Sequence, residues 1–332
     1  MHSYITRCVL ALFITFLASL TACSVGDGRL DDAGKYIVYI SGHYNDRACY
    51  WKDDGESITR VDLSNPVSDP YSRASAITVY NGDVYVSGYY TGGNPNACFW
   101  KNGQITTMTL GSTNTLFVTE GRVLIGGYKS GYACYWDNGI YVLVDAAMNT
   151  SINSIFLENN NVHMTKTYVG NGIYFYTNGS LSGPLINSSS YSNMSRTWFY
   201  GGIRYTAGIT NMASNWIAYW VGDNGPNILT NNSNTSAALP FGLHVYKGDV
   251  YVAKEEYNQA CYWINNAAGK VLLPAPGNSR ATAIRVTGGT IFASGSYVTV
   301  STIPCYWRDE KRIDLDAPSA AADTTGVFVA PR

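Results

Sequence analysis

Cysteine is the first candidate for chemistry in this chain, because thiolates act as nucleophiles, metal ligands and disulfide partners. Five of the seven cysteines share one setting: alanine or proline before, then an aromatic residue and tryptophan after. They are Cys49, Cys98, Cys134, Cys261 and Cys305. Equivalent positions in a repeated unit point the same way and do not face one another, as disulfide geometry requires. We therefore expect buried thiols that act as small apolar side chains and neither pair nor bind metal.

The common signatures of catalysis are absent from the sequence. It contains no Gly-x-Ser-x-Gly elbow, no His-Glu-x-x-His motif and no phosphate-binding loop. The four histidines, at positions 2, 43, 163 and 244, are widely separated, so we expect no catalytic residue, no metal ion and no cofactor. Loop carboxylates such as Asp46 and Glu255 would suit glycoside chemistry if the fold brought them within a few ångströms of each other.

Tyrosine and charged side chains in the loops are the better candidates for binding. The chain has 27 tyrosines but only 14% charged residues. A tyrosine lies near the start of most loops that follow the second strand of each predicted unit, and its flat face and hydroxyl suit a sugar or a protein partner. Packing between units and solvation of loop charges are the alternative explanations. The candidate ligand-binding residues are Tyr44, Arg47, Tyr89, Tyr90, Tyr128, Lys129, Tyr168, Lys254, Glu255, Tyr257 and Tyr297.

The elements that position these loops form a repeated unit, with the tryptophan pattern in seven copies spaced 36 to 49 residues apart. Residues 173–176 and 217–220 are altered copies. In the second unit, Asn-Gly pairs at 81–82 and 102–103 predict tight hairpins. Strands are predicted at 75–80, 83–89, 97–100 and 104–110. Four antiparallel strands in about 40 residues are typical of a propeller blade. We therefore predict an all-β, seven-bladed β-propeller.

The two ends of the repeat array predict how the ring closes. The first unit starts at residues 36–42, which align with the second strand of the other units, so its first strand is missing. Residues 324–329 align with a first strand and have no hairpin after them. The C-terminal strand should therefore complete the first blade, which hides edge strands that would invite aggregation.

The repeat resembles those of known propeller proteins. The small-aromatic-Trp-x-x-Gly pattern is similar to the HAF-type repeats of secreted bacterial proteins, and Gly126-Gly127 followed by Tyr135 and Trp136 is faintly kelch-like. The resemblance covers nearly the whole chain after the leader, but it depends on short packing motifs. It implies a propeller fold and export, and it carries over no catalytic residue.

The N-terminal residues have the pattern of a targeting segment. Arg7 precedes an apolar run over residues 8–20, which is too short for a comfortable transmembrane helix and fits a signal peptide. Leu20-Thr21-Ala22-Cys23 resembles a bacterial lipobox, which implies cleavage after residue 22 and lipidation of Cys23. If the host has two membranes, the sorting rule that this resemblance implies makes Ser24 an indicator of the outer membrane. The alternative is an ordinary signal peptide with a chance cysteine. We divide the chain into a signal peptide (1–22), a lipidated tether (23–34) and one propeller domain (35–332).

Charge excludes one class of partner, and the remaining features leave three functions open. The net charge is −1, which gives no electrostatic case for binding nucleic acid. The first hypothesis is a lipid-anchored module of the cell envelope that binds a glycan or a protein partner at one mouth of the propeller. The second is a carbohydrate-active enzyme, a hydrolase or lyase, and the third is a structural envelope component without a small ligand.

Overall fold

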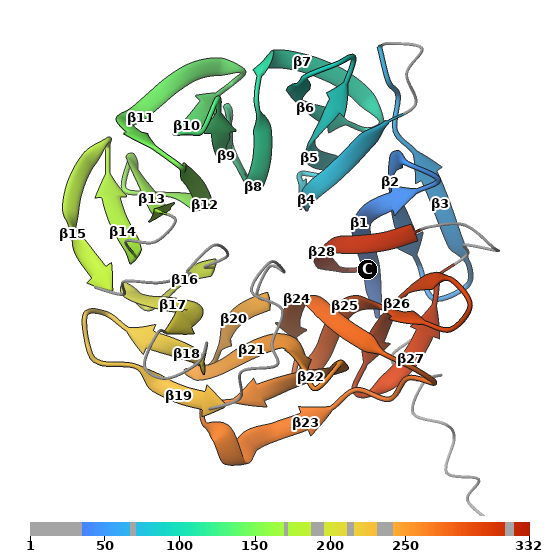
Figure 1. Ribbon diagram of the computed structural model, residues 1–332. Helices are drawn as coiled ribbons and strands as arrows, with labels where there is room; N and C mark the ends of the chain where they lie inside the picture. Colours follow the sequence, from blue (N-terminus) through green and yellow to red (C-terminus); the bar gives the residue numbers. More distant parts are fainter. Residues whose placement is uncertain are drawn as a thin grey trace, which may run out of the picture.

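The protein is a closed ring of seven four-stranded antiparallel sheets, as predicted (Figure 1). The computed structural model describes residues 35–66, 71–168, 172–186, 196–210, 216–230, 242–315 and 322–332. The predicted signal peptide, Cys23 and the tether lie outside the described residues. Within the described residues the helical content is one short 3-10 turn, η1 (Ala267–Gly269), and no helix is long and apolar enough to cross a membrane.

Each blade runs from an innermost first strand to an outermost fourth strand. Blades one to three are β28 (Ala322–Pro331), β1 (Tyr36–Tyr44), β2 (Arg47–Asp53), β3 (Ile58–Asp62); β4 (Ser72–Tyr80), β5 (Asp83–Thr91), β6 (Pro95–Lys101), β7 (Gln104–Leu110); and β8 (Ser112–Thr119), β9 (Arg122–Lys129), β10 (Tyr132–Asp137), β11 (Ile140–Met148). Blades four and five are β12 (Thr150–Glu158), β13 (Asn161–Tyr168), β14 (Gly172–Thr177), β15 (Ser180–Ile186); and β16 (Arg196–Tyr200), β17 (Ile203–Thr210), β18 (Trp216–Val221), β19 (Asn227–Thr230). Blades six and seven are β20 (Gly242–Tyr246), β21 (Asp249–Glu256), β22 (Gln259–Ile264), β23 (Lys270–Leu272); and β24 (Ser279–Thr287), β25 (Thr290–Val298), β26 (Thr302–Arg308), β27 (Lys311–Asp314).

Ring closure by the C-terminal strand is confirmed. β28 pairs antiparallel with β1, with Val329 opposite Val38 and Val327 opposite Ile40. Val329 is buried in the same apolar cluster as Val38 and Ile40. The first and last strands of the described residues therefore share one sheet (Figure 1).

The hairpin turns form because asparagine and glycine tolerate a positive φ. In blade two, Asn102 and Gly103 adopt φ values of 49° and 81°. The Asn102 side chain also accepts a hydrogen bond from the Val84 amide at 2.9 Å, and so ties the second hairpin to the first. The same bond recurs in other blades, from Val123 to Asn138, Val162 to Asn178, Val250 to Asn265 and Ile291 to Asp309.

The repeated Cys-x-Trp pattern forms the contact between neighbouring blades. Cys134 and Trp136 of blade three are buried in one cluster with Ala97 and Phe99 of blade two. All five repeat cysteines are free and buried, which confirms that they pack as small apolar side chains. The tryptophan indoles also reach the preceding crossover, since Trp100 donates to the Ser64 carbonyl at 2.6 Å and Trp307 to the Pro274 carbonyl at 2.9 Å.

The seam between blades four and five is built differently. The six buried apolar clusters among the described residues each join two neighbouring blades, and this seam has none of them. Phe156 of blade four instead contacts Phe199 of blade five, with ring centroids 3.9 Å apart and the rings tilted by 38°. The Arg204 guanidinium lies 4.6 Å from the Phe175 ring centroid across the same seam. Aromatic and cationic side chains therefore take the place of the repeat packing here.

Candidate functional site

A cavity lies on the axis of the ring, and β-bulges in the innermost strands shape it. The pairing register of β4 shifts between Ala74 and Ala76, which leaves Ser75 as an extra residue. A bulge bends a strand and redirects its side chains. Equivalent shifts in four further blades leave extra residues Asn114, Asn153, Thr282 and Thr325. Four of the five extra residues, all except Asn153, line the cavity.

The bulges place a layer of polar side chains at one end of the cavity. Asn114 Nδ2 donates to Asn153 Oδ1 at 3.0 Å, which joins blades three and four. Thr282 and Thr324 hydroxyls are 3.0 Å apart across blades seven and one. From this layer the cavity runs toward the turns between the first and second strands, since Glu158 lines it beside one of those turns.

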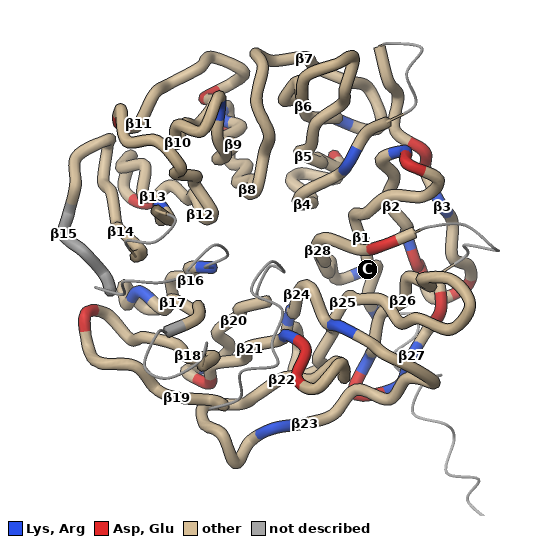
Figure 2. The backbone as a smooth tube through the Cα atoms, in the orientation of Figure 1, with Lys and Arg blue, Asp and Glu red and all other residues tan. Residues whose placement is uncertain are grey.

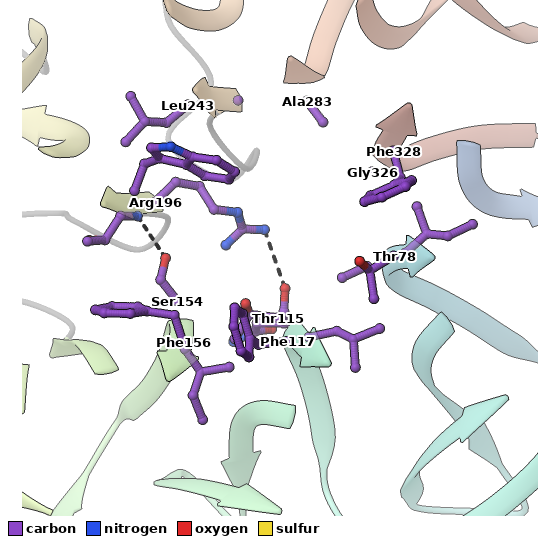
Figure 3. Close-up of a pocket in the computed structure, with 18 of the residues that line it drawn as sticks. Thr78, Thr115, Phe117, Ser154, Phe156, Arg196, Leu243, Ala283, Gly326 and Phe328 are labelled. Carbon is purple, nitrogen blue, oxygen red and sulfur yellow. Dashed lines mark hydrogen bonds between the residues drawn. The ribbon is translucent and has the colours of Figure 1, made fainter. Parts of the chain in front are cut away.

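The cavity has a volume of about 450 Å³ and its lining comes from the first strand of every blade (Figure 3). The most informative position is the third residue before the first hairpin turn of blades two to seven, to which Phe328 corresponds in blade one by its pairing with Tyr39. Across the seven blades this position holds Phe328, Thr78, Phe117, Phe156, Trp198, His244 and Arg285. All of these except His244 line the cavity. Four aromatic rings therefore surround a space of the size that small ligands occupy.

Arg196 extends from blade five into the cavity, toward blades four and three (Figure 3). Its Nη1 donates to the Asn153 carbonyl at 2.8 Å and its Nη2 to the Asn114 carbonyl at 3.5 Å. Both acceptors are carbonyls of bulge residues, so the guanidinium links blade five to blades four and three at the bulges. Burial lowers the pKa of Arg196 to about 10, so the side chain remains a cation at neutral pH.

Arg285 brings a second guanidinium to the cavity. Its Cζ lies 4.7 Å from the Trp198 ring centroid and 5.6 Å from that of Phe328. Burial lowers its pKa to about 10 as well. A cation over an aromatic face is attracted by the ring quadrupole. Arg285 therefore contacts blades five and one from its own place in blade seven.

His244 makes an edge-to-face contact with the Trp198 ring, and its imidazole stays neutral. The two ring centroids are 4.5 Å apart in an edge-to-face arrangement. His244 Nδ1 accepts a hydrogen bond from the Val286 amide at 3.1 Å. Burial, with the nearby Arg285 charge, lowers the pKa of His244 to about 3. The imidazole therefore fixes the indole without adding charge to the cavity.

The cavity lining is positively charged overall. Figure 2 shows basic positions on the inner strands β16 and β24. Among the described lining residues the one carboxylate is that of Glu158, which is exposed beside its hairpin turn. No ion pair of the described residues involves Arg196 or Arg285. Two cations thus share one cavity, and no described carboxylate pairs with either of them.

The eleven residues selected from the sequence lie elsewhere, and none of them lines the axial cavity. All are at or beyond the ends of second strands, or at the start of the third, on the opposite face of the ring from the first hairpin turns. The Arg60 guanidinium lies 3.9 Å from the Tyr44 ring centroid, and the Lys129 ammonium lies 4.7 Å from the Tyr141 ring centroid. The Tyr297 hydroxyl donates a hydrogen bond to Asp314 at 3.1 Å. These three side chains therefore contact the outermost strand of their own blade.

The other selected residues differ in exposure. Tyr90, Tyr168 and Glu255 are partly buried, while Arg47, Tyr128 and Tyr257 are exposed. Lys254 is fully buried, and burial lowers the pKa of its ammonium to about 8. Tyr89 lies beside Tyr71, and burial, with a hydrogen bond to Tyr71, raises the pKa of Tyr89 to about 12. Whether any of these residues binds a ligand stays a prediction.

A charged cluster occupies the same face between blades seven, one and two. Arg280 pairs with Asp323, and Arg73 pairs with Asp46 at 2.8 Å. His43 lies among them, and burial together with Arg73 lowers the pKa of its ring to about 4. Here the cations have carboxylate partners, unlike those of the axial cavity. Among the described residues no group of three or more histidine, cysteine, aspartate or glutamate side chains is arranged to hold a metal ion.

Sequence reasoning missed the cavity residues Arg196, Arg285, Trp198, Phe117 and Phe156. The copies of the repeat differ most in the loops, which made the loops the expected place for a site. The first strands follow the repeat and were therefore expected to be scaffold. The available signal was a difference between repeats within those strands. The position of Thr78 in blade two holds an aromatic residue, histidine or arginine in the other six blades. The position of Arg196 in blade five holds a small residue in the others.

Comparisons with known proteins agree on the fold. No family model matches the chain, and no curated protein matches it. A putative 6-phosphogluconolactonase from Bacteroides uniformis is similar in structure, with a TM-score of 0.53 and 10% identity over 90% of this chain and 100% of that one. A prolyl endopeptidase structure is similar with a TM-score of 0.51 and 11% identity over 91% of this chain and 53% of that one. The chain thus spans about half the length of the endopeptidase, and these likenesses show the propeller fold alone.

Proposed function

We propose that this protein is an exported, lipid-anchored binding protein of the cell envelope whose ligand, a small glycan, enters the axial cavity. The observation that carries the proposal is the set of four aromatic rings at equivalent positions around a cavity of about 450 Å³. Small-ligand sites are concave, mostly apolar and in the range of 300–1,000 Å³. Aromatic faces suit the apolar faces of sugar rings, while the bulge layer supplies hydroxyl and amide groups for sugar hydroxyls.

The geometry favours a glycan over a protein partner as the occupant of this site. A protein partner needs a broad surface of about 800 Å² on each side. The axial cavity is instead surrounded by the first strands of the seven blades. A space of this shape suits a ligand of a few rings. The loop face, where Tyr128 and Tyr257 are exposed, is the alternative place for a protein partner.

Binding is also favoured over glycoside cleavage. Hydrolysis of a glycosidic bond commonly uses two carboxyl groups that flank the bond. The described lining of the cavity offers Glu158 alone. On the loop face, Asp46 is paired with Arg73, and Glu256 is buried in an ion pair with Lys270. Neither carboxylate faces the axial cavity.

A cavity-filling variant tests the proposal. Thr78 points toward the cavity (Figure 3), and the equivalent position of blade five already holds tryptophan, so Thr78→Trp fills the space with a residue this fold accepts. The purified lipoprotein in detergent is applied to a glycan array beside Thr78→Trp, Thr78→Val and the loop-face variant Tyr128→Ala. We expect wild type, Thr78→Val and Tyr128→Ala to bind the same glycans and Thr78→Trp to bind none. Binding that survives Thr78→Trp and is lost in Tyr128→Ala would place the site on the loop face.

A further inference from the structure

The two arginines of the axial cavity are both related to Trp198, one through the strand they share and one through a direct contact. Arg196 and Trp198 are two residues apart on β16, so their side chains leave the same face of the strand. The Arg285 guanidinium lies over the Trp198 ring at 4.7 Å. Both positive charges are therefore within one side-chain length of the same ring, in one cavity.

Their hydrogen-bonding capacity is largely unused. A guanidinium has five N–H donors in a rigid fork. Arg196 donates to the Asn153 and Asn114 carbonyls, which fixes its position and leaves further donors. Arg285 makes no hydrogen bond within the described structure, and its nitrogens are not among the buried atoms that lack a partner, so they remain open to the cavity.

Like charges in one cavity repel each other, and burial makes each of them costlier. Other arginines of the described residues have a carboxylate beside them, as Arg280 has Asp323 and Arg122 has Asp137. Among the described residues, the printed partners of the cavity cations are backbone carbonyls for Arg196 and aromatic faces for Arg285. An anion entering the cavity would offset this unbalanced charge.

We infer that the axial cavity selects a sugar that carries an oxyanion, a carboxylate, sulfate or phosphate, and binds that group between Arg196 and Arg285. The guanidinium fork matches the geometry of these oxyanions and binds them with charge-assisted hydrogen bonds. The sugar ring then lies among Trp198, Phe117, Phe156 and Phe328. The inference rests on the proposed function and adds the chemical class of the ligand.

Matched pairs of neutral and acidic sugars test the inference. The probes are glucose, galactose and mannose, the corresponding uronic acids, and their 6-sulfates and 6-phosphates, titrated against the lipoprotein in detergent while tryptophan fluorescence is followed. We expect at least one acidic sugar to bind 10-fold or more tightly than its neutral parent, and higher salt to weaken it. The member of each set that binds distinguishes carboxylate from sulfate or phosphate recognition.

Variants assign the effect to the cavity arginines. Arg285→Gln should remove the preference for the acidic sugar, and Arg285→Lys should retain only part of it, because an ammonium keeps the charge without the fork. Arg73→Gln, on the loop face, is the matched control and should change nothing. Equal binding of neutral and acidic sugars, an unchanged preference in Arg285→Gln, or binding of no acidic sugar at all would overturn the inference.

The same data separate the inference from the proposed function. If neutral sugars bind and Thr78→Trp abolishes that binding, the cavity is a glycan site without acidic selectivity, and only the inference is lost. If acidic sugars bind Thr78→Trp as tightly as wild type, the cavity is not the site, and both are lost.

Discussion

The Arg285 guanidinium on β24 lies 4.7 Å from the Trp198 ring centroid on β16, although these strands belong to blades seven and five. The contact spans the position of blade six, whose His244 holds the edge of the same indole. Side chains of three blades therefore meet at the axis, in addition to the buried clusters that join blade five to six and blade six to seven. This arrangement makes the cavity a shared site of the ring, which exists only when the ring is closed.

Two arginine-to-methionine variants should differ in stability. Arg196→Met leaves the Asn153 and Asn114 carbonyls without their donor, which should cost about 1–3 kcal/mol in the free energy of unfolding. Arg285→Met loses cation–π contacts but removes a charge without a counter-ion, so its free energy of unfolding should be unchanged or raised. Urea unfolding measures both. A larger loss in Arg285→Met than in Arg196→Met would contradict the assigned roles.

The stability of the protein should fall as the pH drops below about 6.5, in part because of His244. The folded ring has a pKa of about 3, whereas the unfolded ring takes up its proton near the ordinary pKa of 6.5. Between these two values the unfolded state binds more protons than the folded state. His244 therefore lowers the free energy of unfolding by about 1.4 kcal/mol for each unit by which the pH falls. His244→Asn keeps a hydrogen-bond acceptor for the Val286 amide without a titrating group. Urea unfolding of this variant at pH 4 to 7 should give a shallower slope, and an equal slope would refute the assignment.

The five repeat cysteines should be unreactive in the native protein. All are buried, and burial raises the pKa of Cys134 and of Cys261 to about 12, while the pKa values of Cys98 and Cys305 lie well above the ordinary thiol range. Only the thiolate attacks a disulfide reagent. A thiol assay with an aromatic disulfide at pH 8 should detect almost none before unfolding and all five in denaturant. Rapid reaction of any one of them in the folded protein would count against the packing described.

Deleting residues 323–332 should destabilise the whole ring. The deletion removes nearly all of β28, which pairs with β1 along its length and supplies buried Val329. The loss exposes the edge of β1 and opens the contact between blades seven and one. Calorimetry should show a lower melting temperature for the entire transition, while Arg332→Ala, which removes one exposed ion pair with Glu56, should leave it nearly unchanged. An unchanged melting temperature in the deletion would refute closure by this strand.

Cys23 should determine where the protein resides. If it is lipidated, as its lipobox-like context predicts, multiple acyl chains hold the protein stably at a membrane. Cys23→Ser should then release the protein into the soluble envelope fraction, with the propeller still folded. Cell fractionation together with mass spectrometry of the N-terminal peptide measures this. An unlipidated Cys23 in the wild-type protein would reduce the segment to an ordinary signal peptide.

The fold was largely predictable from the sequence, because blade packing is local and repeated. Each Cys-x-Trp strand buries both faces, and each Asn-Gly pair fixes a hairpin, so seven copies of one pattern define seven blades without knowledge of distant contacts. The missing first strand of blade one likewise identified β28 as its replacement. Blade five, whose altered pattern lacks the cysteine, still forms four strands.

The candidate site was not predictable in the same way. Arg196, Trp198 and Arg285 lie in first strands that the repeat pattern marks as scaffold, and Arg285 is 87 positions after Trp198 in the chain. What the sequence by itself determined is the number of blades, the burial of the thiols and the closing strand, because these follow from residue type and spacing within one unit. Only the tertiary structure decided that two arginines and four aromatic rings share one cavity. Closing the ring converts equivalent positions in distant repeats into neighbours around an axis.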